Sequence, residues 1–160
     1  MTKADDQEFH AYVTQRMDRW RRSAYLMCQD WHTADDLVSV TVAKLYRHWS
    51  SVRAAENRDA YAQRVLTRVW IDERRRPWRR QEWLVDQEPE GVTVTPEVTD
   101  RDSLAAMLAS LGRRQRAVVV LRFYLDYSVE ETAEILGISE GTVKSQSARG
   151  LQALRLHYRS

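Results

Sequence analysis

Apolar side chains recur at intervals of three and four residues along most of this 160-residue chain, the spacing of helices that bury one face. In the first half the pattern predicts a helix over residues 6–27, a second that starts at Thr33 and a third that starts near Arg58. Thr33 is a suitable N-cap, because Asp35 and Asp36 follow it in the first turn, where the helix dipole favours carboxylates. The expected inward stripes are Val38, Val42, Leu45 and Trp49 in the second helix and Tyr61, Val65 and Val69 in the third.

The second half shows the same helical spacing. A short helix around residues 104–111 is expected to stop at Gly112, and a helix with a broad apolar face follows in "RRQRAVVVLRFYL". The β-branched run Val118–Val120 could also form a strand. Arginines on both sides and the absence of a partner strand favour a helix.

Two further helices joined by a tight turn are predicted in "SVEETAEILGISEGTVKSQSARGLQALR", residues 128–155. Ser128 and Glu131 form a capping box that begins the first of them. Gly137 occupies the position where a helix ends in the left-handed conformation, and Ser139 can cap the next helix. Ala133 is small enough for the two helices to cross closely.

The spacing of Ala133, Gly137 and Val143, with Leu136 and Ile138 completing a shared core, is that of a helix-turn-helix whose second helix reads DNA. Gln146 departs from this pattern, which usually has an apolar residue there. The exposed face of the second helix would carry residues suited to base edges and phosphates: Thr142, Lys144, Ser145, Ala148 and Arg149. The alternative is a plain helical hairpin with a solvated polar face.

Charge is gathered into blocks although the net charge is only +2. Residues 64–80 hold seven arginines against two acids, whereas residues 81–100 hold six acids, no Lys or Arg, two prolines and a glycine. We therefore expect an all-α protein with one small helical domain over 1–80, an extended acidic linker over 81–100 and a second small helical domain over 101–160.

Aromatic residues are interleaved with the arginines of the first basic block. Unstacked bases can stack on aromatic rings while arginines hold the backbone, so the block is a candidate for binding melted DNA. The alternative places the rings in the core and the arginines on a solvated face; it applies most readily to Tyr61, and Trp70 fits either interpretation. The candidate residues are Tyr61, Arg64, Arg68, Arg74, Arg75, Arg76 and Trp78.

Other kinds of site find little support. Cys28 is the sole cysteine, the four histidines are scattered, and neither a glycine-rich phosphate loop nor a catalytic triad is present. We expect no enzyme activity, no catalytic residue, no metal and no cofactor. The polar start predicts no signal peptide, and no apolar run is long enough to span a membrane, so a cytoplasmic, nucleoid-associated protein is expected.

The stretch "LGRRQRAVVVLRFYLDYSVEETAEILGISEGTVKSQSARGLQALR" resembles the fourth domain of a sigma-70 family RNA polymerase sigma factor. It is most similar to the extracytoplasmic-function (ECF) group, of the actinobacterial SigE type. In the first half, "DWHTADDLVSVTVAKLYRHW" resembles the sigma domain 2 helix that docks on the polymerase clamp, and "AYAQRVLTRVWIDERRR" resembles the helix that opens the −10 element.

The resemblance implies a sigma factor that binds core RNA polymerase and directs promoter-specific initiation through −35 and −10 recognition and promoter melting. It implies that Asp36, Leu37 and Lys44 contact the polymerase. Ser39 and Val40 replace a Gln-Glu pair that is common in the family, and Arg68 stands where many members have Asn, so the −10 preference stays open. The family often works with an anti-sigma protein, but the sequence identifies neither such a protein nor the promoter motif, target genes or inducing signal.

The acidic linker has two interpretations. In the family this segment threads through the polymerase, where six carboxylates could mimic nucleic acid; a solvated spacer is the alternative. The competing function is a stand-alone regulator that binds duplex DNA as a dimer through the helix-turn-helix. Such a regulator would need neither the aromatic-arginine helix nor the linker.

Overall fold

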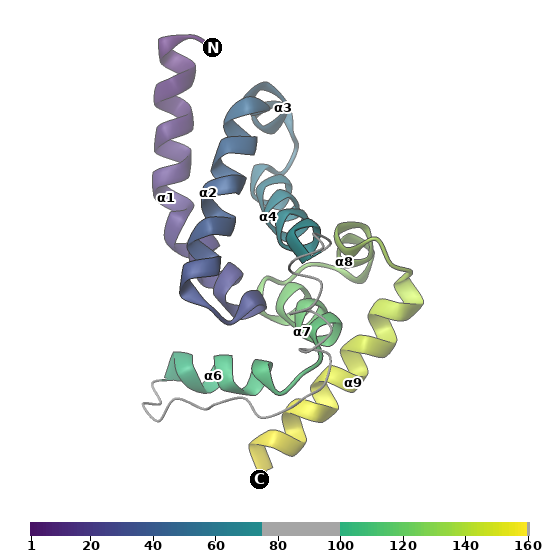
Figure 1. Cartoon of the computed structure of the whole chain (residues 1–160). Helices are drawn as coiled ribbons and strands as arrows, with labels where there is room; N and C mark the ends of the chain where they lie inside the picture. The colour runs from purple at the N-terminus through teal and green to yellow at the C-terminus, as the bar shows by residue number, and fades with distance from the viewer. Residues whose placement is uncertain (75–99, 160) are drawn as a thin grey trace. The chain divides into compact units, whose positions relative to one another are not determined.

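The computed structural model describes residues 1–74 and 100–159, and the regular structure within these ranges is entirely helical (Figure 1). The chain divides into two compact units, Met1–Glu73 and Arg74–Ser160. This confirms the predicted all-α class for the described residues. The predicted linker, 81–100, lies outside the described ranges except for Asp100, which is the first residue of a helix.

The first unit holds α1 (Lys3–Cys28), α2 (Trp31–Arg47), α3 (Trp49–Ala54) and all but the last residue of α4 (Arg58–Arg74). The second holds α6 (Asp100–Ala109), α7 (Arg113–Val119), the π-helical turn η1 (Val120–Tyr124), α8 (Val129–Leu136) and α9 (Glu140–Arg159). The predicted helices are thus present, with the addition of α3 and of the π-helical turn.

The start of α2 differs from the expected one. Asp30, not Thr33, is the N-cap, and its Oδ2 accepts a hydrogen bond from the backbone N–H of Thr33 at 2.9 Å. A carboxylate is a strong capping acceptor, so the helix begins before Thr33, at Trp31. The hydrogen bonds from Thr33 hold the pKa of Asp30 below its ordinary value. The hypothesis of a cap at Thr33 is therefore wrong.

Aromatic rings form much of the core of the first unit. Tyr12 packs against Trp20 and Trp49, with ring centroids 5.9 and 5.5 Å away, and Phe9 meets Trp49 edge to face at 5.3 Å. Trp49 is the first residue of the short α3 and is buried. The two long helices α1 and α2 lie side by side (Figure 1).

The buried stripe of α4 lies one position away from the predicted one. Ala62, Leu66 and Val69 are buried, whereas Tyr61 and Val65 are only half-buried. Neighbouring positions on a helix point about 100° apart, so a wide apolar stripe leaves its edge residues partly in water. Of the three residues of the predicted inward stripe, Val69 is buried and Tyr61 and Val65 lie at its edge.

In the second unit, the run Val118–Val120 is helical and buried, which confirms the helix over the strand. The buried Arg116 serves this fold directly. Its Nε donates to the carbonyl oxygen of Leu108 at 3.0 Å and its Nη2 to that of Leu111 at 3.3 Å. Carbonyls at the end of a helix lack partners within the helix, so this guanidinium satisfies the end of α6 from within the core.

Candidate nucleic-acid interface

The turn between α8 and α9 has the predicted geometry. Ser128 Oγ accepts from the Glu131 N–H at 3.0 Å, and Glu131 Oε1 accepts from the Ser128 N–H at 2.9 Å, so the capping box is complete. Gly137 ends α8 at φ 68°, in the left-handed region that glycine adopts without strain. Ser139 Oγ accepts from the Thr142 N–H at 3.1 Å and so caps α9.

A small apolar core fixes the angle between these helices. Val118, Ala133 and Val143 form its buried centre, and Val129, Leu136 and Ile138 pack against it. The shared core predicted for a helix-turn-helix is confirmed. Because α8, α9 and α7 all contribute to it, the orientation of α9 is set by packing as well as by the turn.

Four of the five predicted DNA-contacting residues are exposed on α9: Lys144, Ser145, Ala148 and Arg149. Lys144 and Ala148 are four residues apart, as are Ser145 and Arg149, so they form two adjacent rows on one side of the helix. Thr142 differs, because it is half-buried and its hydroxyl lies 2.8 Å from Ser139 Oγ.

Gln146, the departure from the helix-turn-helix pattern, is half-buried. Its Oε1 is buried without a hydrogen-bond partner among the described residues. The polar group therefore occupies the side of α9 that faces the unit, as the apolar residue of the pattern would. The four exposed side chains form the proposed DNA-reading face of α9, which carries two cations, one hydroxyl group and one small apolar residue.

The basic helix α4 is described only in part. Arg64 and Arg68 are exposed, Tyr61 is half-buried, and Trp70 is buried at 4% exposure. The core interpretation is thus correct for Trp70. The remaining candidates, Arg75, Arg76 and Trp78, and the side chain of Arg74, lie outside the described residues.

On α2 the three predicted polymerase contacts are not equivalent. Asp36 and Lys44 are exposed, but Leu37 is fully buried and presents no surface to a partner. The side chain of Leu37 therefore belongs to the core of the unit and not to its exposed surface. Val40 was not among the predicted contacts, yet it is 42% exposed and lies midway between Asp36 and Lys44. Asp36, Val40 and Lys44 are spaced four residues apart, so the sequence alone could have placed all three on one side of the helix.

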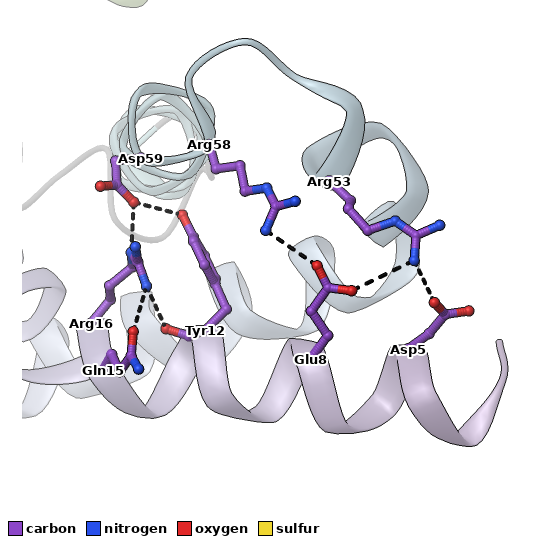
Figure 2. A network of polar contacts seen from close by, with 8 residues as sticks. All are labelled: Asp5, Glu8, Tyr12, Gln15, Arg16, Arg53, Arg58 and Asp59. Atoms are coloured by element: carbon purple, nitrogen blue, oxygen red, sulfur yellow. Dashed lines mark hydrogen bonds and ion pairs between the residues drawn. The ribbon is translucent and has the colours of Figure 1, made fainter.

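A polar network fastens the start of α4 to α1 (Figure 2). Asp59 Oδ1 accepts from the Tyr12 hydroxyl at 2.9 Å and from Arg16 Nε at 2.6 Å. Partial burial would raise the pKa of Asp59, but the hydrogen bonds from Arg16 and Tyr12 outweigh it and hold that pKa below its ordinary value. Burial, together with the bond to Asp59, raises the pKa of Tyr12.

In the neighbouring part of the network, one carboxylate of α1, that of Glu8, contacts arginines on both sides of the α3–α4 connection. Arg58 Nη1 donates to Glu8 Oε1 at 3.3 Å, and Arg53 Nη1 lies 3.6 Å from Glu8 Oε2. Arg53 also pairs with Asp5. The connection between α3 and α4 is therefore held at each end by α1.

Over the described ranges, no group of three or more His, Cys, Asp or Glu residues is arranged to hold a metal ion. None of the helices described is both long and apolar enough to cross a lipid bilayer.

Two family models match the chain: "Sigma-70 region 2" over residues 12–80 and "Sigma-70, region 4" over residues 101–154. The chain is 39% identical to the RNA polymerase sigma-E factor of Streptomyces coelicolor, over 92% of this chain and 84% of that protein. It is 32% identical to the ECF RNA polymerase sigma factor SigE of Mycolicibacterium smegmatis, over 89% of this chain and 58% of that protein.

Solved structures of more distant proteins share the fold. The sigma factor RpoE from Bartonella quintana, in complex with the anti-sigma factor NepR, superposes with a TM-score of 0.76 at 22% identity, over 96% of this chain and 98% of that one. CnrH, in complex with the cytosolic domain of CnrY, superposes with a TM-score of 0.64 at 19% identity, over 96% and 89%.

These matches decide between the two functions that the sequence left open. A stand-alone regulator has no need of a sigma region 2, and the match over residues 12–80 covers most of the first unit. The chain belongs to the extracytoplasmic-function group of sigma-70 family RNA polymerase sigma factors, which direct transcription initiation and are not enzymes.

Proposed function

We propose that this sigma factor reads the −35 promoter element with α9, holds and opens −10 DNA with α4, and docks on core RNA polymerase through α2. The observation that carries the proposal is the reading face of α9. Lys144, Ser145, Ala148 and Arg149 are exposed on a helix whose other side is packed into the helix-turn-helix core. A recognition helix needs this combination, since only a rigidly held helix can present side chains to a major groove in register.

The residues of α9 divide by role. Lys144 is near the start of the helix, where recognition helices contact base edges. Ala148, one turn on, leaves room for close approach to a base or a thymine methyl. Arg149 is further along, where it would grip the phosphate backbone. Ser145 Oγ donates to the Thr142 carbonyl at 3.2 Å and can still accept a hydrogen bond from a base amine.

Transcription from a randomised −35 library, reconstituted with core polymerase, tests this division. A base contact is worth about 1–3 kcal/mol of discrimination, whereas a phosphate contact weakens binding on all sequences alike. Lys144→Ala should therefore change the selected −35 motif, and Arg149→Ala should lower activity on most sequences. Unaltered activity and an unaltered motif in both variants would remove the reading role from α9.

The proposed role of α4 is supported by its exposed cations. Arg64 and Arg68 are four residues apart on one side of the helix, so they can follow one stretch of DNA backbone. Tyr61, at the edge of the same side, can offer part of its ring to an unstacked base. The proposal also includes four residues whose side chains lie outside the described part of the chain: Arg74, Arg75, Arg76 and Trp78.

The proposed polymerase surface is the exposed row Asp36, Val40 and Lys44 on α2. Protein interfaces commonly have an apolar centre and a polar rim, and an apolar residue between two charged ones reproduces this on a small scale. Gel filtration with purified core polymerase tests it: the wild-type chain should co-migrate and Asp36→Arg should not. Circular dichroism must show that the variant is folded.

We further propose that an anti-sigma protein holds this chain inactive. The support is the likeness in fold to the sigma factor RpoE, whose solved structure contains the anti-sigma factor NepR. A protein that co-purifies with the chain and prevents its binding to core polymerase would bear this out. Association with the nucleoid would follow from promoter binding.

A further inference from the structure

Charged side chains join α1 to the end of α3 and the first residues of α4, and the sign of the charges reverses once along this contact. Along α1, the acids Asp5 and Glu8 come first and the base Arg16 later; they face Arg53, Arg58 and then Asp59 (Figure 2). Each pair joins opposite charges, and the hydroxyl of Tyr12 adds a hydrogen bond to Asp59 between them.

This order favours one position of the start of α4 along α1, which α4 crosses (Figure 2). A shift of one helical turn, about 5.4 Å, in one direction would bring Arg58 towards Arg16, and in the other direction would bring Asp59 towards Glu8. Either shift sets like charges against one another. The packing of the Tyr12 ring against Trp20 and Trp49 also favours this position, and the order of the charges adds to that preference.

The consequence reaches the proposed DNA-holding face. Arg64 and Arg68 follow Asp59 on the same continuous helix, about 7.5 and 13.5 Å further along its axis. A helix transmits the position of its first turn to its later turns. The hydrogen bonds from Tyr12 and Arg16 to Asp59 therefore help to determine the positions of Arg64 and Arg68.

We infer that Tyr12 and Asp59 are positioning residues for promoter opening: through them α1, which carries none of the proposed DNA contacts, fixes the place of the α4 face that holds DNA. This inference rests on the proposed function of α4. It assigns to the hydroxyl of Tyr12 a role that the core packing of its ring does not need.

The test is Tyr12→Phe, which removes the hydroxyl and keeps the ring packed against Trp20 and Trp49. Full-length variants are combined with core polymerase and compared on a duplex promoter and on the same promoter with a pre-melted bubble. On the duplex we expect about a tenfold loss, the order that one hydrogen bond to a charged group allows. On the bubble, and in polymerase binding, we expect wild-type behaviour.

Tyr46→Phe is the matched control. Its hydroxyl also donates to a carboxylate of α1, Asp6 Oδ1 at 3.3 Å, but it joins α1 to α2 and leaves α4 untouched. It should transcribe both templates like the wild type. A purely structural role of Tyr12 predicts equal losses on both templates, in proportion to the folded fraction measured by circular dichroism.

Arg64→Ala separates the two proposals. If it loses activity on the duplex and Tyr12→Phe does not, the positioning role is wrong and the role of α4 stands. If Arg64→Ala and Arg68→Ala show no greater loss on the duplex than on the bubble, both proposals are wrong. Equal losses of Tyr12→Phe on the two templates would also overturn the positioning role.

Discussion

A methyl group added at residue 150 would have no room. A Cβ built on Gly150 lies 2.5 Å from Cγ2 of Val119, at the crossing of α9 with α7. Val119 is buried, and its β-branched side chain has few alternative rotamers. By contrast, a Cβ on Gly141, near the start of α9, meets nothing closer than Ser139 Oγ at 3.9 Å, which is an ordinary contact.

These two glycines should respond oppositely to substitution by alanine. Overpacking costs about 1–3 kcal/mol, and alanine gains about 1 kcal/mol over glycine in a helix. Gly150→Ala should therefore lower the free energy of unfolding in urea, and Gly141→Ala should raise it slightly. Combining Gly150→Ala with Val119→Ala should relieve the clash. A Gly150→Ala variant as stable as Gly141→Ala would contradict the close crossing.

Leu37 and Val40 are three residues apart on α2 but have different environments. Leu37 is fully buried and Val40 is 42% exposed. Leu37→Ala should lose about 2–5 kcal/mol of stability by leaving a cavity.

Val40→Asp should leave the unfolding transition close to that of the wild type and weaken binding to core polymerase. Titration of labelled polymerase and thermal unfolding of both variants measure the two effects separately. Unchanged affinity for Val40→Asp would remove this residue from the proposed surface.

At the scale of the elements, the ion pairs between α1 and α4 make stability depend on pH. The folded-state pKa of Asp59 is held below its ordinary value by Arg16 and Tyr12. Its contribution is therefore complete above the unfolded pKa, about 3.9, and is lost as the pH falls through the folded value.

Asp59→Asn should be less stable than the wild type by a constant amount between pH 8 and 5. The difference should be about 0.2–1 kcal/mol, because the pair is partly exposed and screened by solvent. Below about pH 4 the two unfolding curves should converge as the wild-type carboxylate is protonated. Urea unfolding across this range measures the difference, and a gap that widens in acid would contradict the assignment.

Capping shows which element boundaries were predictable. The predicted caps Ser128 and Ser139 were correct because each accepts a hydrogen bond from a backbone N–H only three positions away. The start of α2 was wrong because two residues, Asp30 and Thr33, are each suited to the cap. The carboxylate occupies it, and Thr33 becomes its hydrogen-bond partner.

At the scale of the whole molecule, each of the two units has its own buried core. In the first, Trp49, Leu66 and Leu37 are among the buried residues; in the second, Val118 and Val143 are fully buried. Polymerase and −10 contacts are proposed for the first unit, and the −35 contact for the second. Such a division lets one chain contact separate parts of a promoter.

Fragments 1–80 and 100–160 should therefore fold alone. Both should give helical circular dichroism, and the first should unfold cooperatively on heating. The second, with about 60 residues, should be marginally stable, since small domains bury a smaller fraction of their surface. A first fragment that stays unfolded until the second is added would contradict independent folding.

The amino-acid sequence by itself determined the all-helical class, the helix-turn-helix and most of its reading face. These depend on local relations: the three- and four-residue apolar spacing, the Ser128 box, and the left-handed residue that Gly137 supplies. A helix and its caps are stabilised by neighbours in the chain, so a linear pattern contains the information.

The tertiary structure alone decided which side of each helix is buried and which distant residues meet. It placed Leu37 and Trp70 inside, turned Arg116 into the core to satisfy the end of α6, and brought Asp59 to Tyr12, 47 residues away. Apolar periodicity cannot assign the edge of a buried stripe. The partner of a charge 40 or more residues away depends on how the helices pack, because burial is a property of the assembled surfaces and not of any segment.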